Sequence, residues 1–376
     1  MANILVLGGG FGGVTAAERL AATLGANHQI TLVSRDDRFL FYPALVRFAF
    51  GECEVDDISF DLRRAMTARG IRFIKAEVAR VSPGYRHATL AHGEVEGDLP
   101  YDYLVFALGR RLATEKVTGF FEHANHLLTA EAALKFGEAV SSFHKGHAVI
   151  GNCFEAKLPI PVFETAFALS RRLQERGERE ACRITIINPD FASLESFGGR
   201  EWVEKLHQAI DEHNIEYVDD FRVTQITALE VRTFDGHSRA YDLLMLLPPF
   251  AGVGPVMHTD ITDSKNFIRV DHTMRVKDTE RMYAVGDAIN LCGVKTAHMS
   301  VRQAEVAAAN VQAEIEGRVP QAKYQHEIRS IIDEGGRYSI YLHKKLWTDE
   351  TEDVSQGRVW RWAKLVQEKT WMMTHS

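Results

Sequence analysis

The sequence predicts an α/β protein with two Rossmann-like, doubly wound βαβ domains, followed by a C-terminal region with an amphipathic helix. Three observations predict this class. An apolar strand runs into a glycine-rich turn and a helix at residues 4–20. A second strand–helix–strand unit covers residues 147–189, and a further apolar strand ends in Gly-Asp within residues 281–288. Strands that alternate with helices in this way form parallel sheets.

The first turn has the pattern G-x-G-x-x-G between a strand and a helix, and in that context the motif indicates dinucleotide binding. Gly8 allows the tight turn, Gly10 lets the backbone approach a diphosphate, and Gly13 lets helix and strand pack closely. Unpaired N–H groups at the helix N-terminus favour phosphate. A glycine-rich turn without a ligand is the alternative, and the register of strand, glycines and helix disfavours it.

Composition limits the class of protein. The 376 residues are 45% hydrophobic and 25% charged, as in a soluble globular protein of two or three domains. The net charge of −7 argues against a nucleic-acid partner. No apolar run approaches the ~18 residues of a membrane span, and no signal peptide is expected before the first strand. Four cysteines do not form a disulfide framework in a chain of this length, and they favour either thiols in a reducing, cytoplasmic location or one redox pair. We expect no metal site.

The ends of the other strands carry polar groups and glycines. After the second strand, at 28–33, Ser34 stands where an acidic residue usually binds a ribose hydroxyl, although its own hydroxyl can form that bond. A buried strand at 102–109 ends in Gly109. The strand that ends in Gly286-Asp287 can place its carboxylate on a ribitol chain.

Together these motifs resemble the FAD motifs of the two-dinucleotide-domain flavoprotein disulfide reductase superfamily. The finer resemblance is to the sulfide:quinone oxidoreductases, with the type II NADH dehydrogenases as cousins, and it covers nearly the whole chain. Further segments carry it: 39–46, 57–60, 70–74, 248–252, Lys295-Thr296 and 357–369. The resemblance and the motifs imply FAD as cofactor, bound by Gly8, Gly10, Phe11, Gly12, Gly13, Ser34, Arg35, Pro43, Val78, Ala107, Gly109, Gly286, Asp287, Lys295 and Thr296.

Three regions are expected on this basis. A discontinuous FAD-binding domain takes residues 1–112 and 240–320, and a second Rossmann-like domain is inserted at 113–239. Residues 321–376 form the C-terminal region, with a quinone pocket and a membrane-facing surface.

The second domain lacks a nucleotide loop. After Gly151 the chain has bulky side chains and prolines up to Pro161, where a diphosphate would need to approach the backbone. This argues against NAD(P)H as electron donor and against type II NADH dehydrogenase chemistry. It agrees with the resemblance to the sulfide:quinone group, whose second domain has the fold without the nucleotide.

The sequence departs from that group at its redox cysteines. The family places one about six residues before the glutamate that opens the helix, and Leu158 stands there. A further family cysteine lies in the C-terminal region, but no cysteine follows Cys292. Cys153 and Cys292 are therefore candidates for a displaced catalytic pair, and the alternative is that both are ordinary buried thiols.

Three other side chains are candidates for chemistry near the flavin. Glu164 could relay protons, or could only be a helix N-terminal charge. His298 could relay protons to a quinone, or could only be packed. Lys295, with Thr296, could stabilise negative charge on the reduced flavin, or could be surface charge.

The quinone is expected between segment 39–46 and the C-terminal region, against Phe41, Pro43, Leu346 and Trp362. The helix expected from Gly357 to Met373 has basic and Trp side chains that suit a membrane interface, and it could equally cap the flavin domain. The chain ends without the amphipathic tail of many relatives. We therefore expect membrane attachment, at the inner face of the cell membrane, to be weak or to need a homo-oligomer.

Three functions remain open. The first is an FAD-dependent oxidoreductase that passes electrons from a sulfur-type or other small reductant to a quinone. The second is a flavin-binding partner or regulatory protein with a degenerate catalytic site, which Leu158 favours. The third, an NADH:quinone oxidoreductase, is disfavoured by the loop at 151–161.

Overall fold

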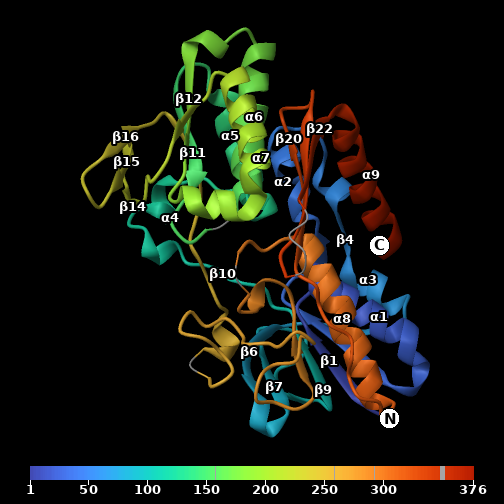
Figure 1. The fold of residues 1–376 in the computed structure, drawn as a ribbon. Helices are drawn as coiled ribbons and strands as arrows, with labels where there is room; N and C mark the ends of the chain where they lie inside the picture. The colour runs from blue at the N-terminus through green and yellow to red at the C-terminus, as the bar shows by residue number, and fades with distance from the viewer. Residues whose placement is uncertain (157, 258, 292, 348–351) are drawn as a thin grey trace.

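The computed structural model describes residues 1–156, 158–257, 259–291, 293–347 and 352–376, and two parallel sheets dominate it (Figure 1). The first sheet has the strand order β19-β9-β1-β2-β5. In that order the strands are Met282–Ala284, Tyr103–Phe106, Asn3–Leu7, Gln29–Ser34 and Arg72–Lys75. Helices α1 (Phe11–Leu24) and α8 (Ala297–Ile315) pack against each other, and α1 contacts β1, β2 and β9.

The turn between β1 and α1 is closed by two glycines. Gly8 has a φ of +113°, and a Cβ at that position would lie 2.2 Å from the carbonyl oxygen of Ala107. A Cβ on Gly13 would lie 1.7 Å from the carbonyl oxygen of Gly8. Both positions therefore exclude a side chain, whereas a Cβ on Gly10 would meet nothing within 4 Å.

The second sheet has the order β13-β12-β11-β17, and all its pairings are parallel. Its strands in that order are Glu216–Val218, Cys182–Ile187, Gly146–Asn152 and Leu243–Leu247. Strand β17 begins after residue 239, where the predicted second domain ends, so the prediction assigned it to the first domain. That boundary is too early, because β17 pairs with β11, about a hundred residues upstream, and no local pattern signals such a pairing.

Both faces of the second sheet are covered, as parallel sheets require. Helices α5 (Ala130–Ser142), α6 (Pro159–Glu175) and α7 (Phe191–Glu212) contact its strands. A separate apolar cluster includes Val149, Ile187 and Leu244 of the sheet, together with Phe120 of the short helix α4 (Phe120–His123). The helix that the sequence placed at about 162–176 begins three residues earlier, at Pro159.

Smaller sheets and short helices connect these units. The small sheets are β6-β7-β8 (Glu77–Ser82, His87–Ala91, Gly97–Pro100), β14-β15-β16 (Val223–Ile226, Glu230–Thr233, Ser238–Ala240), β3-β4 (Arg38–Leu40, Ser59–Asp61) and β10-β18 (Arg111–Leu112, Phe250–Ala251). Two short helices lie in the N-terminal part, α2 (Leu45–Ala49) and α3 (Leu62–Thr67).

The C-terminal region is an antiparallel sheet, β20-β21-β22, followed by helix α9. Its elements are Glu327–Asp333, Ser339–Lys345, Glu352–Gly357 and Arg358–His375. The helix lies along one side of the molecule and ends near α3 (Figure 1). Two parallel Rossmann-like sheets and a C-terminal helix confirm the predicted fold class.

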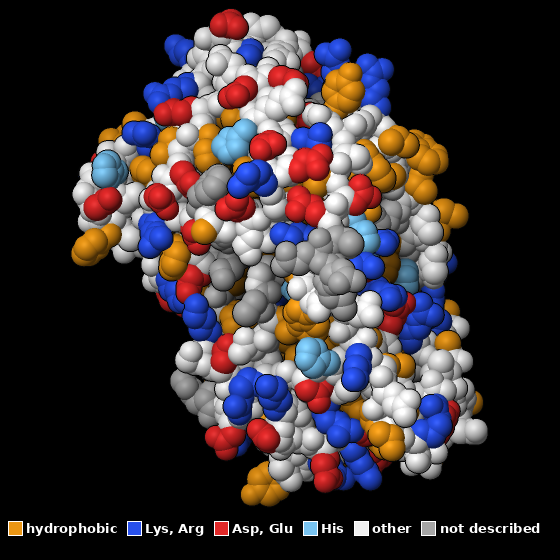
Figure 2. All heavy atoms as spheres, viewed as in Figure 1, with side chains coloured by type: hydrophobic (Ala, Val, Ile, Leu, Met, Phe, Trp, Pro, Cys, Tyr) orange, Lys and Arg blue, Asp and Glu red, His pale blue; other side chains and the backbone are white. Residues whose placement is uncertain are grey.

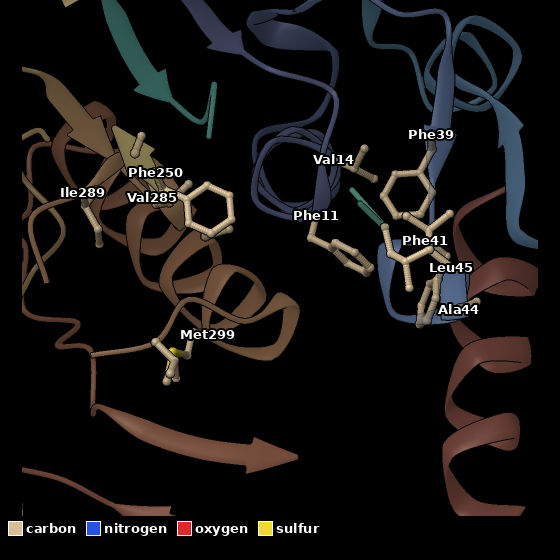
Figure 3. Packing of buried hydrophobic residues seen from close by; sticks show 14 of the residues in the cluster. Phe11, Val14, Phe39, Phe41, Ala44, Leu45, Phe250, Val285, Ile289 and Met299 are labelled. Atoms are coloured by element: carbon tan, nitrogen blue, oxygen red, sulfur yellow. The ribbon is translucent and has the colours of Figure 1, made fainter. Parts of the chain in front are cut away.

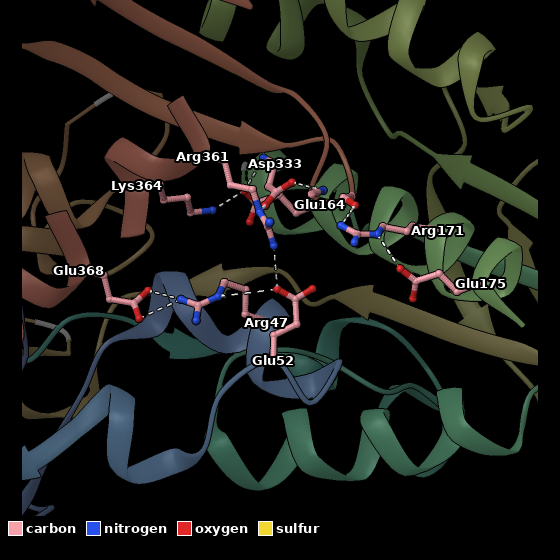
Figure 4. Close-up of polar contacts among 11 residues, drawn as sticks. Arg47, Glu52, Glu164, Arg171, Glu175, Asp333, Arg361, Lys364 and Glu368 are labelled. Atoms are coloured by element: carbon pink, nitrogen blue, oxygen red, sulfur yellow. Dashed lines mark hydrogen bonds and ion pairs between the residues drawn. The ribbon is translucent and has the colours of Figure 1, made fainter. Parts of the chain in front are cut away.

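Ion pairs join α9 to other parts of the chain (Figure 4). Lys364 pairs with Glu164 of α6, and Glu368 accepts hydrogen bonds of 2.8 and 2.9 Å from Nη1 of Arg47 in α2. Arg361 bridges Asp333 of β20, at 2.9 Å, to Glu52. The side chains of Glu164 and Glu368 are only 5% and 8% exposed, so both carboxylates depend on these cations.

The close contact between Gly8 and Gly13 yields a prediction about stability. Gly13→Ala should lower the thermal unfolding midpoint of the apoprotein by several degrees, because overpacking at such a contact costs about 1–3 kcal/mol. Gly10→Ala is the matched control, since its Cβ points into open space. Circular dichroism measures thermal unfolding, and equal midpoints for the two variants would contradict the packing role of Gly13.

The ion pair between α6 and α9 yields a second prediction. Lys364→Met should destabilise the C-terminal region by about 3–5 kcal/mol, because it leaves the buried Glu164 carboxylate without its cation. Adding Glu164→Gln should restore part of this loss. The control is Arg318→Met, whose ion pair with Glu316 is exposed. Urea unfolding followed by tryptophan fluorescence measures these changes, and a double variant no more stable than Lys364→Met would count against the pair.

Candidate functional site

The glycine turn forms a cradle at the carboxyl edge of the first sheet. Helix α1 begins directly after its N-cap residue Gly10, and no side chain caps it. Its first N–H groups therefore depend on backbone, water or a ligand. With open space at Gly10 and a positive dipole end, this edge fits a dinucleotide diphosphate. Gly12 packs against Val285, next to the Gly286-Asp287 turn.

The residues after β2 lie on one side of the cradle. Ser34 is buried, and a Cβ on Gly9 would lie 2.6 Å from its hydroxyl oxygen, so Ser34 reaches the glycine turn. Arg35 is exposed and pairs with Asp36 at 3.5 Å. Asp37 pairs with Lys75 at 2.6 Å, which commits that carboxylate to an ion pair. Ser34 is therefore the residue of this segment nearest to the glycines.

The ends of β9 and β19 form the other side. Ala107 lies against Gly8, and Gly109 has a φ of +71°. Gly286, with φ of +73°, donates its N–H to Oε1 of Gln303 in α8 at 2.8 Å. Gln303 is buried, and the sequence analysis did not single it out. It fixes the turn that carries Asp287.

Arg110 was also missed by the sequence analysis. Its Nε lies 3.0 Å from Oδ2 of Asp287, and its guanidinium carbon lies 3.3 Å from the centroid of the Phe250 ring. Its position directly after Gly109 was the only sequence signal.

An apolar cluster packs beside the cradle (Figure 3). The Phe11 ring contacts Phe39, Phe41 and Trp371, with centroids 5.0, 5.2 and 4.9 Å apart. Trp371 of α9, and not the predicted Trp362, thus joins the segment 39–46 to the C-terminal region. Trp362 is 67% exposed.

The remaining predicted residues lie in varied settings. Pro43 is exposed, Val78 is buried in β6, and Leu346 packs partly buried after β21, where its N–H bonds to the carbonyl of His326.

Helix α8 begins close to the cradle. The Thr296 hydroxyl caps it and accepts the Met299 N–H at 3.3 Å. Lys295 Nζ donates to the carbonyl oxygen of Ile289. Thr296 therefore helps to orient the α8 N-terminus, whose dipole would favour negative charge nearby.

His298 is bound to a carboxylate. Its Nε2 lies 2.7 Å from Oε1 of Glu327, and His343 Nε2 lies 3.1 Å from Oε2 of the same side chain. Burial alone would raise the pKa of Glu327, but the two histidine hydrogen bonds outweigh it and lower the pKa to about 2. Burial also lowers the pKa of His298. Among the residues that the structure describes, no group of His, Cys, Asp and Glu has the arrangement of a metal site.

Side chains line a small cavity at the carboxyl edge of the second sheet, among them Asn152, Glu155 and Asn188. The loop after β11 places Glu155, with a φ of +71°, between Lys116 and Lys265, and both lysines pair with it. A Cβ on Gly151 would lie 2.3 Å from the Ile187 carbonyl oxygen, so this glycine serves strand packing. A carboxylate therefore stands in the loop where a diphosphate would bind.

The structure describes the surroundings of only one of the two candidate cysteines, Cys153. Cys153 is buried in the apolar cluster with Val149 and Phe120, and burial raises the pKa of its thiol. These surroundings disfavour a thiolate. Cys292 lies outside the described residues, and so does any pairing with it. Leu158 directly precedes α6, as its N-cap residue.

Glu164 lies in the second turn of α6. It accepts the Asp333 N–H at 2.8 Å and pairs with Lys364. Burial raises the pKa of Glu164, although Lys364 opposes this. These contacts tie Glu164 to the C-terminal region.

Helix α9 has an exposed apolar stripe, Val359, Trp362, Val366 and Met373. Figure 2 shows hydrophobic side chains gathered on this side of the molecule. Within the described ranges, no helix is both long enough and apolar enough to cross a membrane.

Comparison with known proteins shows what the chain is similar to. Mitochondrial sulfide:quinone oxidoreductase of Mus musculus is 24% identical over 317 residues, 78% of this chain and 67% of the relative. The alternative NAD(P)H-ubiquinone oxidoreductase C1 of Arabidopsis thaliana is 24% identical over 364 residues, 84% of this chain and 68% of the relative. The chain thus spans about two thirds of the length of both proteins.

A solved structure has the same fold. The crystal structure of the sulfide:quinone oxidoreductase from Aquifex aeolicus superposes with a TM-score of 0.91 at 23% identity, and the match covers 99% of this chain and 91% of that one. The family model for pyridine nucleotide-disulphide oxidoreductases matches residues 2–308. The chain therefore belongs to the pyridine nucleotide-disulphide oxidoreductase family, as the resemblance at its glycine motifs predicted.

Proposed function

We propose that the protein is an FAD-dependent oxidoreductase of the sulfide:quinone oxidoreductase type, which passes electrons from a small reductant to a quinone. The observation that carries the proposal is the contrast between the two sheets. The first offers a glycine cradle at its carboxyl edge, whereas the corresponding loop of the second carries Glu155, paired with two lysines, beside a small cavity. One dinucleotide site fits a flavin enzyme whose donor is not a dinucleotide.

Each part of the cradle has a role toward FAD. The N–H groups of α1 after Gly10 would hold the diphosphate, Ser34 would meet a ribose hydroxyl, and Asp287 would hold the ribitol. Bound FAD supplies two-electron chemistry that no side chain can supply. The α8 N-terminus, capped by Thr296, would favour the negative charge that reduction brings.

The quinone side rests on the aromatic cluster. Phe41 of the segment 39–46 packs on Phe11 beside the cradle, and Trp371 of α9 packs on the same ring. Trp371 therefore joins Phe41 as a candidate wall of an apolar quinone pocket. Leu346 and Trp362 stay candidates only if the pocket extends along the C-terminal region.

Protons for quinone reduction would come through His298. Burial lowers the pKa of His298 and favours the neutral ring, in which Nε2 can donate to Glu327 while Nδ1 can accept a proton and then pass it on. Glu164 is the weaker candidate, because its carboxylate is already bound to Lys364 and to the Asp333 N–H.

The exposed stripe of α9 supports peripheral attachment to a membrane. Val359, Trp362, Val366 and Met373 lie at helical spacing, and Arg358 and Lys369 lie near them in the sequence. Apolar and basic side chains together suit a lipid interface. A quinone that partitions into lipid would then reach the aromatic cluster from the membrane. Self-association through the same stripe is the alternative.

The electron donor decides between this proposal and its alternatives. The purified protein should take up FAD and turn yellow, and micromolar NADH should not bleach the flavin rapidly under anaerobic conditions. Sulfide and other small thiols should be titrated separately, each with a short-chain quinone as acceptor. Rapid bleaching by NADH would favour an NADH:quinone oxidoreductase. FAD uptake without reduction by any donor would favour a regulatory flavin-binding protein, and a protein without FAD would exclude all three.

We expect Cys153 to serve packing. Cys153→Ala should leave flavin reduction by any effective donor unchanged and should lower the thermal unfolding midpoint slightly, because it opens a small cavity in an apolar cluster. Cys182→Ala, another buried thiol, is the matched control. Loss of sulfide-dependent bleaching in Cys153→Ala alone would show that the thiol reacts and would restore the displaced cysteine pair.

A further inference from the structure

Arg110 is a buried cation at the carboxyl edge of the first sheet. Its side chain is 11% exposed and pairs with Asp287, which is 28% exposed. The guanidinium also lies over the face of Phe250, at 3.3 Å from the ring centroid to Cζ. Burial lowers the pKa of Arg110, and the Asp287 carboxylate opposes this effect. Arginine remains protonated in proteins because its ordinary pKa lies above 12.

The backbone fixes all three partners. Arg110 lies between β9 and β10, and Asp287 follows β19, which pairs with β9. Phe250 belongs to β18, which pairs with β10. The guanidinium is therefore placed by two strand pairings rather than by a mobile loop. A cation held in this way can act without reorganisation when a ligand arrives.

The charges of the cradle show what such a cation can do. The glycine turn at residues 8–13 contains no basic side chain. A dinucleotide brings two negative charges on its diphosphate, and Asp287 adds a third nearby. The N-terminus of α1 offers only about half a positive charge. Arg110 is the cation that the structure pairs with Asp287, and without it the carboxylate would repel the cofactor that it is expected to hold.

We propose that Arg110 is a cofactor-affinity residue, which neutralises Asp287 so that this carboxylate does not repel a dianionic flavin dinucleotide. The inference rests on the proposed function, since it requires that FAD occupies the cradle. The ion pair uses Oδ2 of Asp287. The other carboxylate oxygen, Oδ1, can therefore accept a hydrogen bond from a hydroxyl group of the cofactor. Phe250 keeps the guanidinium plane in place by a cation–π contact.

The test measures FAD binding by the full-length apoprotein, with FAD as the probe and quenching of flavin fluorescence as the readout. Arg110→Gln should raise the dissociation constant about 10- to 100-fold, the range expected when a charged partner is lost. The dissociation constant of Arg110→Lys should lie between those of the wild type and Arg110→Gln, because lysine keeps the charge and loses the planar contact with Phe250. The matched control is Arg111→Gln, since Arg111 pairs with the exposed Glu115 at 2.7 Å.

A double variant separates charge balance from a purely structural role. Arg110→Gln combined with Asp287→Asn should bind FAD more tightly than Arg110→Gln alone, because the unpaired carboxylate is removed. The apparent affinity of the wild type should also fall more steeply with salt than that of Arg110→Gln. A structural role would predict additive losses and no change in the salt dependence.

The outcomes distinguish the inference from the proposed function. Wild-type protein that takes up no FAD would overturn the proposed function. Wild-type protein that binds FAD, with Arg110→Gln binding equally well or more tightly, would overturn the inference alone and would show that Arg110 is neutral or in the way of the cofactor. Should Arg110→Gln fail to fold, by circular dichroism, Arg110→Lys and the double variant give the same decision.

Discussion

The approach of helix α1 to strand β1 is the constraint on which the rest of the structure depends. A side chain at position 13 would overlap the Gly8 carbonyl, so the helix can start where it does only with glycine there. The start of α1 then lies at the carboxyl edge of the first sheet. Ser34 reaches the same edge because β2 pairs with β1. Asp287 reaches it because β9 pairs with the other side of β1, and β19 pairs with β9. The cradle is thus a consequence of strand order as much as of the motif.

The C-terminal region extends this arrangement across the molecule. Phe11, the first residue of α1, contacts Trp371 of α9, so the helix that bears the cradle also meets the last helix of the chain. The charges of α9 reach α2 through Arg47 and α6 through Glu164. Buried ion pairs of this kind specify an arrangement more than they stabilise it, because desolvation offsets much of the attraction. They fix where α9 lies, and with it the wall of any pocket beside the segment 39–46.

Features encoded by short segments could be predicted from the sequence, whereas features that depend on contacts between distant segments could not. The β1–α1–β2 unit and the turn at Gly286-Asp287 were predictable because short segments with local patterns encode them. Strand β17 was assigned to the wrong side of a boundary, since its partner β11 is distant in the sequence. Trp371 was passed over for Trp362 because helical periodicity alone does not tell which face meets Phe11. The partner of Glu164, two hundred residues away, carries no sequence signal, and the role of Cys292 stays a prediction.

The two sheets share a fold and differ at their carboxyl edges, and the difference bears on electron flow. At the first edge, small residues and the α1 N-terminus leave backbone N–H groups for phosphate. At the second, Glu155 is paired with two lysines, and α6 begins with Pro159, which has no N–H group to offer a phosphate. A diphosphate there would meet a carboxylate and would have to separate two ion pairs. If FAD occupies the first edge, as proposed, these ion pairs disfavour a dinucleotide donor at the second edge, and this is the physical reason to seek the donor among small reductants.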